Sequence, residues 1–212
     1  MPIPPTDLLL VIDVQRDFCP GGALAIPHGD QVLSPINRLA AHFPNVVLTQ
    51  DWHPANHLSF AASHPGTSPY QTVEMPYGPQ TLWPSHCVQG TPGAEFHPGL
   101  HIPHAELILR KGFRPQIDSY SAFFENDRTT PTGLAGYLRE RGFQRIIIAG
   151  LALDFCVRFS ATDGIRAGFS ILLVPEACRA VALPGSLEAA HADFAALQIP
   201  SATVDQLLAP SN

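Results

Sequence analysis

The chain has 212 residues, of which 45% are hydrophobic and only 14% are charged, enough apolar material for one buried core of ordinary domain size. This composition excludes an intrinsically disordered chain. The formal charge is −6, and Lys and Arg form no cluster, which argues against a phosphate backbone as partner. We therefore expect a folded protein that does not bind nucleic acid.

The first apolar run, 8–12, ends at Asp13 and is too short for a signal peptide. The longest run, 146–153, is far below the roughly 20 residues that cross a bilayer. The cysteines are too few and too scattered for a disulfide-stapled scaffold, and no two of them form a CxxC pair. We expect reduced thiols in a soluble, cytoplasmic protein without a membrane partner. The four cysteines are Cys19, Cys87, Cys156 and Cys178.

The first half of the chain begins with a strand pattern and continues with a helix pattern. The continuous run 8–12 is typical of a strand buried on both faces of a parallel sheet. Asp30 is placed to cap a helix whose apolar residues recur at helical spacing between Val32 and Phe43. Further strands are expected over 46–49 and 107–109.

A long irregular segment, 54–104, separates these two strands and carries many of the Pro, Gly and His residues. A stretch of this length without periodicity is more often a functional loop region than a simple connection.

The second half continues the alternation of helices and strands. Thr130-Pro131 resembles an N-cap followed by proline at the first helical position, and Gly142 would end that helix. The remaining elements are expected as a strand over 146–149, a helix near 155–167, a strand over 171–174, a helix near 185–197 and a last strand around 202–204. This order predicts a three-layer α/β fold, in which a mostly parallel sheet of about six strands is flanked by helices.

Four of the predicted strands are followed by chemically capable residues. Asp13 follows the first strand, Asp51 and His53 the second, Lys111 the third, and a turn that leads to Cys156 the fourth. The carboxyl ends of parallel strands meet at one edge of a sheet, where ligands bind. Taken singly, each residue has an ordinary structural interpretation, such as a turn former, a surface lysine or a small core residue. Their coincidence at one edge favours a functional site.

These groups are suited to nucleophilic catalysis by a thiolate. Cys156 near a helix N-terminus would feel the positive end of the helix dipole, and a nearby Lys111 would favour the thiolate further. Asp13 could accept the thiol proton and later pass it to a leaving amine. Backbone N–H groups of the turn before the helix could hold an oxyanion. The sequence thus predicts acyl transfer without a histidine base.

A second group of residues has the chemistry of a metal site. In an extended segment Asp51 and His53 point the same way, and His86 offers a further imidazole. A carboxylate with imidazoles suits Zn²⁺, Fe²⁺ or Mn²⁺ and leaves positions open for water or substrate. The D-x-H spacing alone is a weak signal, because hydrogen-bonded structural histidines are commoner. His57 and Ser59 lie within reach as further donors.

The remaining histidines have no such context and receive no role. They are His28, His42, His64, His97, His101, His104 and His191.

Five ordered motifs carry a resemblance to a known family. They are 12–24 (IDVQRDFCPGGAL), 51–60 (DWHPANHLSF), 82–91 (LWPSHCVQGT) with 93–97 (GAEFH), 111–112 (KG) with 118–123 (DSYSAF), and 150–157 (GLALDFCV). In this order they resemble the motifs of nicotinamidases in the isochorismatase-like hydrolase superfamily. The resemblance runs from Leu8 to about Glu176. Leu153 is a departure, since many members have threonine there.

The resemblance implies a catalytic trio and an oxyanion hole. Cys156 would be the nucleophile, Asp13 the proton carrier, and Lys111 the group that orients and activates the thiolate. The backbone N–H groups of Ala152 and Cys156 would form the oxyanion hole, preceded by a cis peptide bond between Leu151 and Ala152.

The resemblance also implies one divalent metal ion held by Asp51, His53 and His86, with zinc favoured over iron or manganese. His57 is left out, because its spacing from His53 resembles members in which it is not a ligand. The substrate ring would lie between Phe18 and Trp83, with Tyr120 closing the pocket.

By resemblance, the activity is hydrolysis of nicotinamide, and of pyrazinamide, through a cysteine thioester, with a role in NAD salvage. We expect residues 1–212 to form one isochorismatase-like domain, in which a loop region of about 52–104 carries metal ligands and a lid. A homo-oligomer is also expected. Three alternatives stay open: another small amide as substrate, attack by a metal-activated water with Cys156 as bystander, and a catalytically silent binding protein.

Overall fold

The computed structural model describes residues 3–209, so the outermost positions of the predicted domain lie outside it. A parallel sheet of five strands, in the order β5-β2-β1-β6-β7, forms its centre. The strands are β1 (Asp7–Ile12), β2 (Val46–Asp51), β5 (Leu107–Lys111), β6 (Arg145–Leu151) and β7 (Ser170–Arg179). All five apolar runs that predicted strands before residue 175 are confirmed.

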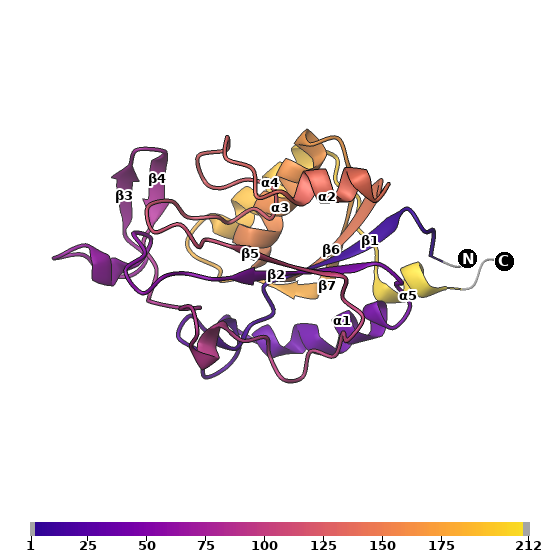
Figure 1. Cartoon of the computed structure of the whole chain (residues 1–212), viewed down its shortest axis with the longest axis horizontal. Coiled ribbons are helices and arrows are strands. Elements are labelled where there is room, and N and C mark those ends of the chain that lie inside the picture. The colour runs from indigo at the N-terminus through magenta and orange to yellow at the C-terminus, as the bar shows by residue number, and fades with distance from the viewer. Residues whose placement is uncertain (1–2, 210–212) are drawn as a thin grey trace.

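Helices cover both faces of the sheet (Figure 1). Along β1, the side chains of Leu9 and Val11 pack on one face, with the core of α1 and α5, while Leu8 and Leu10 pack on the other, with α2 and α4. This alternation follows from the two-residue period of a strand, and full burial on both sides explains the continuous apolar run. The helices are α1 (Leu33–Ala40), α2 (Leu134–Glu140), α3 (Arg158–Arg166), α4 (Ser186–Ala196) and α5 (Val204–Leu208). The three-layer α/β prediction is confirmed.

The predicted sixth strand around 202–204 is wrong. Ser201 makes only an isolated bridge to Leu173 of β7, and the chain then enters α5. The Thr203 hydroxyl accepts a hydrogen bond from the backbone N–H of Gln206, whose side chain accepts one from the backbone N–H of Thr203. This capping box satisfies free donors at the helix start and so favours a helix over a strand.

Two helices also begin later than predicted. Asp30 lies inside a short 3₁₀ turn, Gly29–Val32, and caps nothing, so α1 starts only at Leu33. Pro131 forms a bridge with Phe124, and α2 starts after Gly133, which has a φ of 100°. Gly142, with a φ of 77°, follows the end of α2 as predicted.

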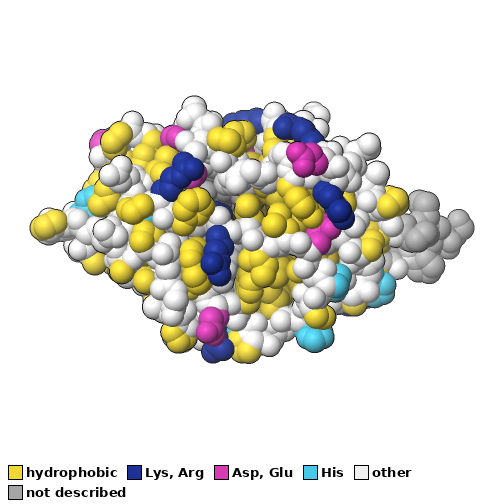
Figure 2. All heavy atoms as spheres, in the orientation of Figure 1, with side chains coloured by type: hydrophobic (Ala, Val, Ile, Leu, Met, Phe, Trp, Pro, Cys, Tyr) yellow, Lys and Arg dark blue, Asp and Glu magenta, His cyan; other side chains and the backbone are white. Residues whose placement is uncertain are grey.

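The long segment between β2 and β5 holds a small antiparallel hairpin that the sequence did not predict. It consists of β3 (Thr72–Met75) and β4 (Gly78–Thr81) and lies at the left end of the molecule in Figure 1, away from the helical layers. On the face shown in Figure 2, the Lys and Arg side chains are scattered. Across residues 3–209, none of the helices is long and apolar enough to cross a bilayer.

The strand register brings the predicted site residues to one edge of the sheet. Asp51 at the end of β2 pairs with Lys111 at the end of β5, and Ile12 at the end of β1 pairs with Gly150 of β6. Gly150 has a φ of +125°, and a Cβ there would lie 2.2 Å from the carbonyl oxygen of Ile12. Only glycine fits this close approach, which leads β6 into the turn that carries Cys156.

Candidate active site

Lys111 is the centre of a buried cluster that joins three strand ends to the turn after β6. Its Nζ lies 2.8 Å from Oδ2 of Asp13 and 3.4 Å from Sγ of Cys156, and it also forms an ion pair with Asp51. The carbonyl oxygen of Ser119 accepts a further hydrogen bond from Nζ at 2.9 Å. The three residues predicted as the catalytic trio are therefore brought together.

Burial and neighbouring charges shift the pKa of each group in this cluster. Burial raises the pKa of Asp13, against the lowering effect of Lys111. Burial alone would lower the pKa of Lys111, but Asp13 and Asp51 raise it well above its usual value, so the amine stays charged. Burial also raises the pKa of Cys156 well above that of a free thiol, although Lys111 opposes the shift. Burial of Cys156 therefore opposes the lowering of its pKa that the helix start and Lys111 were expected to provide.

Asp13 is placed to receive the thiol proton. Its Oδ1 accepts a hydrogen bond from Thr49 Oγ1 at 2.6 Å, whereas Oδ2 faces the charged Nζ of Lys111 at 2.8 Å. One carboxylate oxygen each of Asp13 and Asp51 and the Sγ of Cys156 lie within 4.8 Å of one another. A carboxylate of raised pKa that lies near the thiol fits a proton carrier.

Asp51, His53 and His86 form the arrangement predicted for a metal site. The Nδ1 atoms of His53 and His86 lie 2.8 Å from the carbonyl oxygens of Gly112 and Pro84, respectively, and must donate to them. Both Nε2 atoms are then free as acceptors, and they lie 3.5 and 3.8 Å from Oδ2 of Asp51. Imidazoles oriented by a backbone carbonyl, together with a carboxylate, are the donor set that divalent cations such as zinc prefer. These residues therefore fit the predicted metal.

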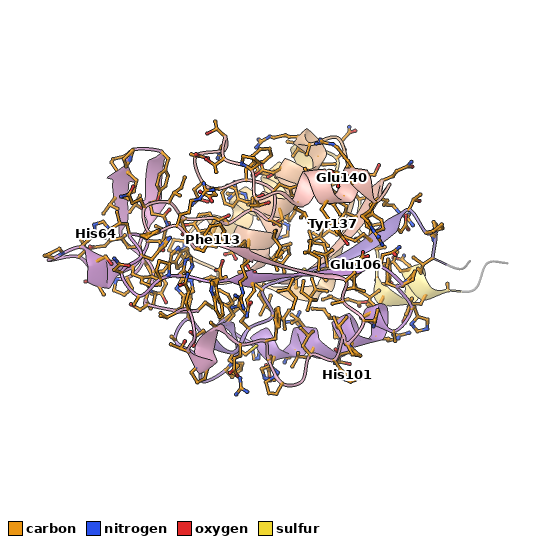
Figure 3. All side chains as sticks on the ribbon, viewed as in Figure 1. His64, His101, Glu106, Phe113, Tyr137 and Glu140 are labelled. Atoms are coloured by element: carbon orange, nitrogen blue, oxygen red, sulfur yellow. The ribbon has the colours of Figure 1, made fainter. Side chains whose placement is uncertain are left out.

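His57 does not have this freedom. It shares a second cluster with His53 and Asp118, within 4.8 Å, but its Nδ1 is 2.7 Å from Ser59 Oγ and its Nε2 is 3.2 Å from the carbonyl oxygen of Ile117. Both ring nitrogens are thus engaged, in keeping with its omission from the ligand set. The unassigned His64 and His101 lie at the periphery of the molecule (Figure 3).

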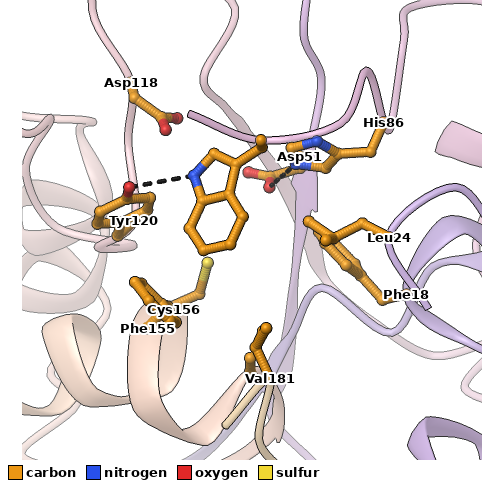
Figure 4. Close-up of a pocket in the computed structure, with 11 residues that line it drawn as sticks. Phe18, Leu24, Asp51, His86, Asp118, Tyr120, Phe155, Cys156 and Val181 are labelled. Carbon is orange, nitrogen blue, oxygen red and sulfur yellow. Dashed lines mark hydrogen bonds and ion pairs between the residues drawn. The ribbon is translucent and has the colours of Figure 1, made fainter. Parts of the chain in front are cut away.

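A pocket opens between the metal residues and the nucleophile (Figure 4). Seven of the predicted site residues line it: Phe18, Asp51, Trp83, His86, Tyr120, Ala152 and Cys156. The indole N–H of Trp83 donates to the Tyr120 hydroxyl at 3.1 Å, which fixes one aromatic wall. Phe18 stands across the pocket beside His86, with the ring centroids 5.4 Å apart. The predicted residues Asp13, Lys111 and His53 are buried and are not among the residues that line the pocket.

Four further lining residues were not predicted. They are Leu24, Asp118, Phe155 and Val181. Phe155 packs edge-on against Trp83 at 4.8 Å, and its place next to Cys156 in the turn was a usable signal. Leu24 and Asp118 stand inside recognised motifs, but Val181 comes from the segment after β7, which no motif covers.

The turn after β6 has the features expected of an oxyanion hole. The peptide bond between Leu151 and Ala152 is cis, as expected, and a single π-type turn, Leu153–Val157, follows. The backbone N–H groups of Phe155 and Val157 donate to the carbonyl oxygen of Ala152 at 3.1 and 3.0 Å. The backbone N–H of Ala152 itself donates to none of the described residues and lies at the pocket.

Comparison with known proteins identifies the family. The family model described as the isochorismatase domain matches residues 7–206. The nicotinamidase of Acinetobacter baylyi is 54% identical over 188 residues, which cover 89% of this chain and 88% of that protein. The solved structure of an Acinetobacter baumanii nicotinamidase and pyrazinamidase has a TM-score of 0.95 at 52% identity and covers 97% of this chain and 99% of its own.

A more distant structure was solved with a metal. The pyrazinamidase of Pyrococcus horikoshii in complex with zinc has a TM-score of 0.76 at 34% identity, over 93% of this chain and 99% of its own. The family model and these three relatives each match most of this chain. The chain therefore belongs to the isochorismatase family, in the branch that contains the nicotinamidases.

Proposed function

We propose that this protein is a nicotinamidase, which hydrolyses nicotinamide to nicotinic acid and ammonia. The observation that carries this proposal is the buried contact of Lys111 with Asp13 and Cys156, at the base of an aromatic pocket that also exposes metal ligands. An identity of 54% to a nicotinamidase supports the same substrate. Pyrazinamide, which has nearly the same shape, is expected as a second substrate, and the cytoplasmic salvage of NAD as the setting.

The reaction starts with proton transfer from Cys156 to Asp13. The thiolate then attacks the carboxamide carbon: the C–S bond forms, and the carbonyl π pair moves onto oxygen. The backbone N–H groups of Ala152 and Cys156 hold this oxyanion. The pair returns as the C–N bond breaks, and Asp13 gives its proton to the departing ammonia.

The thioester left on Cys156 is hydrolysed by water. Asp13 takes a proton from the water as it adds to the carbonyl carbon, and the C–S bond breaks to release nicotinic acid. The proton returns to the sulfur, so the thiol is restored. Lys111 stays charged throughout and stabilises whichever neighbour, carboxylate or thiolate, carries the negative charge.

Asp51, His53 and His86 would hold one divalent cation, zinc in preference to iron or manganese. When bound, this ion supplies a Lewis-acid site for the ring nitrogen, which positions the ring rather than activating the attacking group. Phe18 and Trp83 flank the ring. The predicted homo-oligomer and the predicted extent of the domain stay predictions.

Ammonia release from nicotinamide tests the proposal. We expect turnover in the parent, none in Cys156→Ala, and equal bound metal in both. Cys178→Ala is the matched control, because Cys178 is equally buried but lies outside the pocket lining. Activity that persists without the Cys156 sulfur would contradict thiol catalysis and favour attack by metal-activated water. A parent that binds metal but leaves nicotinamide intact would point to another small amide.

A further inference from the structure

Asp154 is a fully buried carboxylate whose two oxygens bind a segment that none of the motifs covers. Oδ1 accepts a hydrogen bond from the backbone N–H of Val181 at 3.0 Å, and Oδ2 accepts one from that of Ala182 at 2.9 Å. The hydroxyl of Ser186 donates to Oδ2 at 2.5 Å. Asp154 thus ties the turn after β6 to the segment between β7 and α4.

The segment between β7 and α4 that Asp154 binds contains a strained backbone position. Ala182 has a φ of +59°, in the left-handed region that residues with a Cβ disfavour. The neighbouring Val181 lines the pocket, and Ser186 is the first residue of α4. The carboxylate of Asp154 therefore holds a strained backbone in place against the active-site turn.

The other side of this contact is the turn that carries the nucleophile. Asp154 lies two positions before Cys156, inside the single turn Leu153–Val157. The donors expected to hold the oxyanion, the N–H groups of Ala152 and Cys156, lie on either side of Asp154 in the chain. A tilt of the turn at Asp154 would change the angle between these donors.

We propose that Asp154 is a positioning residue for the oxyanion hole, in that it anchors the turn so that both backbone donors point at one oxygen. This inference depends on the proposed amide hydrolysis. Asp154 does not touch the substrate: three partners occupy its oxygens, and it does not line the pocket. Its effect on catalysis passes through the backbone.

Asp154→Asn is the sharpest perturbation, because asparagine has nearly the same shape but replaces one acceptor by an NH₂ donor. That donor would face a backbone N–H of Val181 or Ala182, so at least one hydrogen bond is lost and the turn shifts. Because removing one oxyanion donor costs about 10²–10³-fold in rate, a partial misalignment of both should cost about 10- to 100-fold in kcat. Ser186→Ala is the matched control, since it removes the hydroxyl bond and leaves both backbone bonds.

Two ligands separate an effect on the oxyanion hole from an effect on the pocket. Cys156 should attack the aldehyde carbon of nicotinaldehyde. The C–S bond forms, the carbonyl π pair moves to the oxygen, and the thiol proton moves to Asp13 or to that oxygen, so no group leaves. Its affinity therefore depends on the oxyanion donors. Nicotinic acid, the product of the proposed reaction, should occupy the same pocket without forming a bond to sulfur.

For Asp154→Asn we expect kcat for nicotinamide and the affinity for nicotinaldehyde each to fall by about 10- to 100-fold. The affinity for nicotinic acid and the KM for nicotinamide should change by less than about 2-fold. Ser186→Ala should match the parent within about 2-fold in all four quantities. Equal losses for the aldehyde and the acid would overturn the proposal, because they would assign the effect to the pocket wall through Val181. An unchanged aldehyde affinity would overturn it too.

If Asp154→Asn does not fold, Asp154→Ser, which keeps one smaller acceptor, is compared by the same two affinities and the same criteria. The parent enzyme separates this inference from the function on which it depends. A parent that does not hydrolyse nicotinamide refutes the proposed function. A parent that does, beside an Asp154 variant with parental kcat and aldehyde affinity, refutes only the role of Asp154.

Discussion

Gly112, directly after Lys111, is the backbone support of the proposed metal site. Its carbonyl oxygen accepts the hydrogen bond from Nδ1 of His53 at 2.8 Å. It has a φ of +65°, and a Cβ there would lie 2.4 Å from Cε1 and 2.7 Å from Nδ1 of His53. In Gly112→Ala, the imidazole must therefore move by about 1 Å to reach van der Waals distance, and this movement breaks its hydrogen bond.

The displacement should weaken metal binding without unfolding the protein. Loss of a group that orients a ligating histidine typically costs 10- to 100-fold in metal affinity, which corresponds to about 1.4–2.8 kcal/mol. Left-handed alanine adds a penalty of about 1–2 kcal/mol in stability. Gly142→Ala isolates this second effect, because Gly142 has a φ of +77° and a Cβ added there would meet nothing within 4 Å among the described residues.

The assay is competition for zinc between each variant and a chelator of known affinity, with the metal content measured by mass spectrometry. Gly112→Ala should release zinc at a chelator concentration about 10- to 100-fold lower than the parent, and Gly142→Ala at the parental concentration. In urea Gly112→Ala should lose more stability than Gly142→Ala, because it also breaks the buried hydrogen bond of His53. If Gly112→Ala holds zinc as tightly as Gly142→Ala, His53 does not depend on Gly112, and the assignment of His53 as a ligand oriented by this carbonyl is refuted.

Four other outcomes are expected. In Thr49→Val, loss of the hydrogen bond to Asp13 Oδ1 removes a contact that lowers the pKa of Asp13, so the acidic limb of the kcat/KM profile should move up by about one pH unit; an unmoved limb would exclude Asp13 as the base. Removal of metal by a chelator should raise the KM for nicotinamide, and added zinc should restore it. Gln80→Leu should also raise the KM for nicotinamide, because it removes the hydrogen bond from Gln80 Nε2 to the Tyr120 hydroxyl at 2.9 Å, which holds Tyr120 at the pocket. The Trp fluorescence of the ligand-bound protein should differ from that of the parent, because Trp83 donates to the same hydroxyl. Thr203→Ala should lower the free energy of unfolding by about 0.5–2 kcal/mol in urea, and a parental value would mean that the capping box is not needed.

The positions of the candidate site residues were predictable because buried parallel strands have a recognisable sequence pattern. A strand buried on both faces needs apolar residues at every position, so its end is visible where the first charged residue occurs. Asp13 marks such an end. β5 is an edge strand, in which Ile108 and Arg110 are exposed, so only its short apolar run indicated where it ends. The parallel register then brings Asp13 and Lys111 within 2.8 Å of each other. No long-range information beyond the order of the strands was required.

The errors have local physical causes. The residues 202–204 contain β-branched side chains, which favour a strand, but the side chains of Thr203 and Gln206 cap a helix start. The same Thr-x-x-Gln spacing is readable in the sequence. By contrast, the late start of α2 depends on Pro131 pairing with Phe124, a contact that no local pattern reveals.

The pocket wall was only partly predictable, because tertiary contacts build it. Trp83 and Tyr120 stand in motifs, but their mutual hydrogen bond depends on the fold of two separate loops. Val181 reaches the pocket through the hydrogen bond from its backbone to Asp154. Such a residue carries no chemical signature of its own, so its role is visible only in three dimensions.

The protonation state of Cys156 shows why position and reactivity are separate questions. Local reasoning placed the thiol near a helix start and a lysine, and both would lower its pKa. In the fold, however, full burial outweighs Lys111, whose charge is already shared by Asp13 and Asp51. A thiolate is therefore favoured only when Asp13 takes the proton and the charge of Lys111 is released toward the sulfur. In the proposed mechanism, the positive charge of Lys111 would stabilise the carboxylate of Asp13 before proton transfer and the sulfur of Cys156 after it.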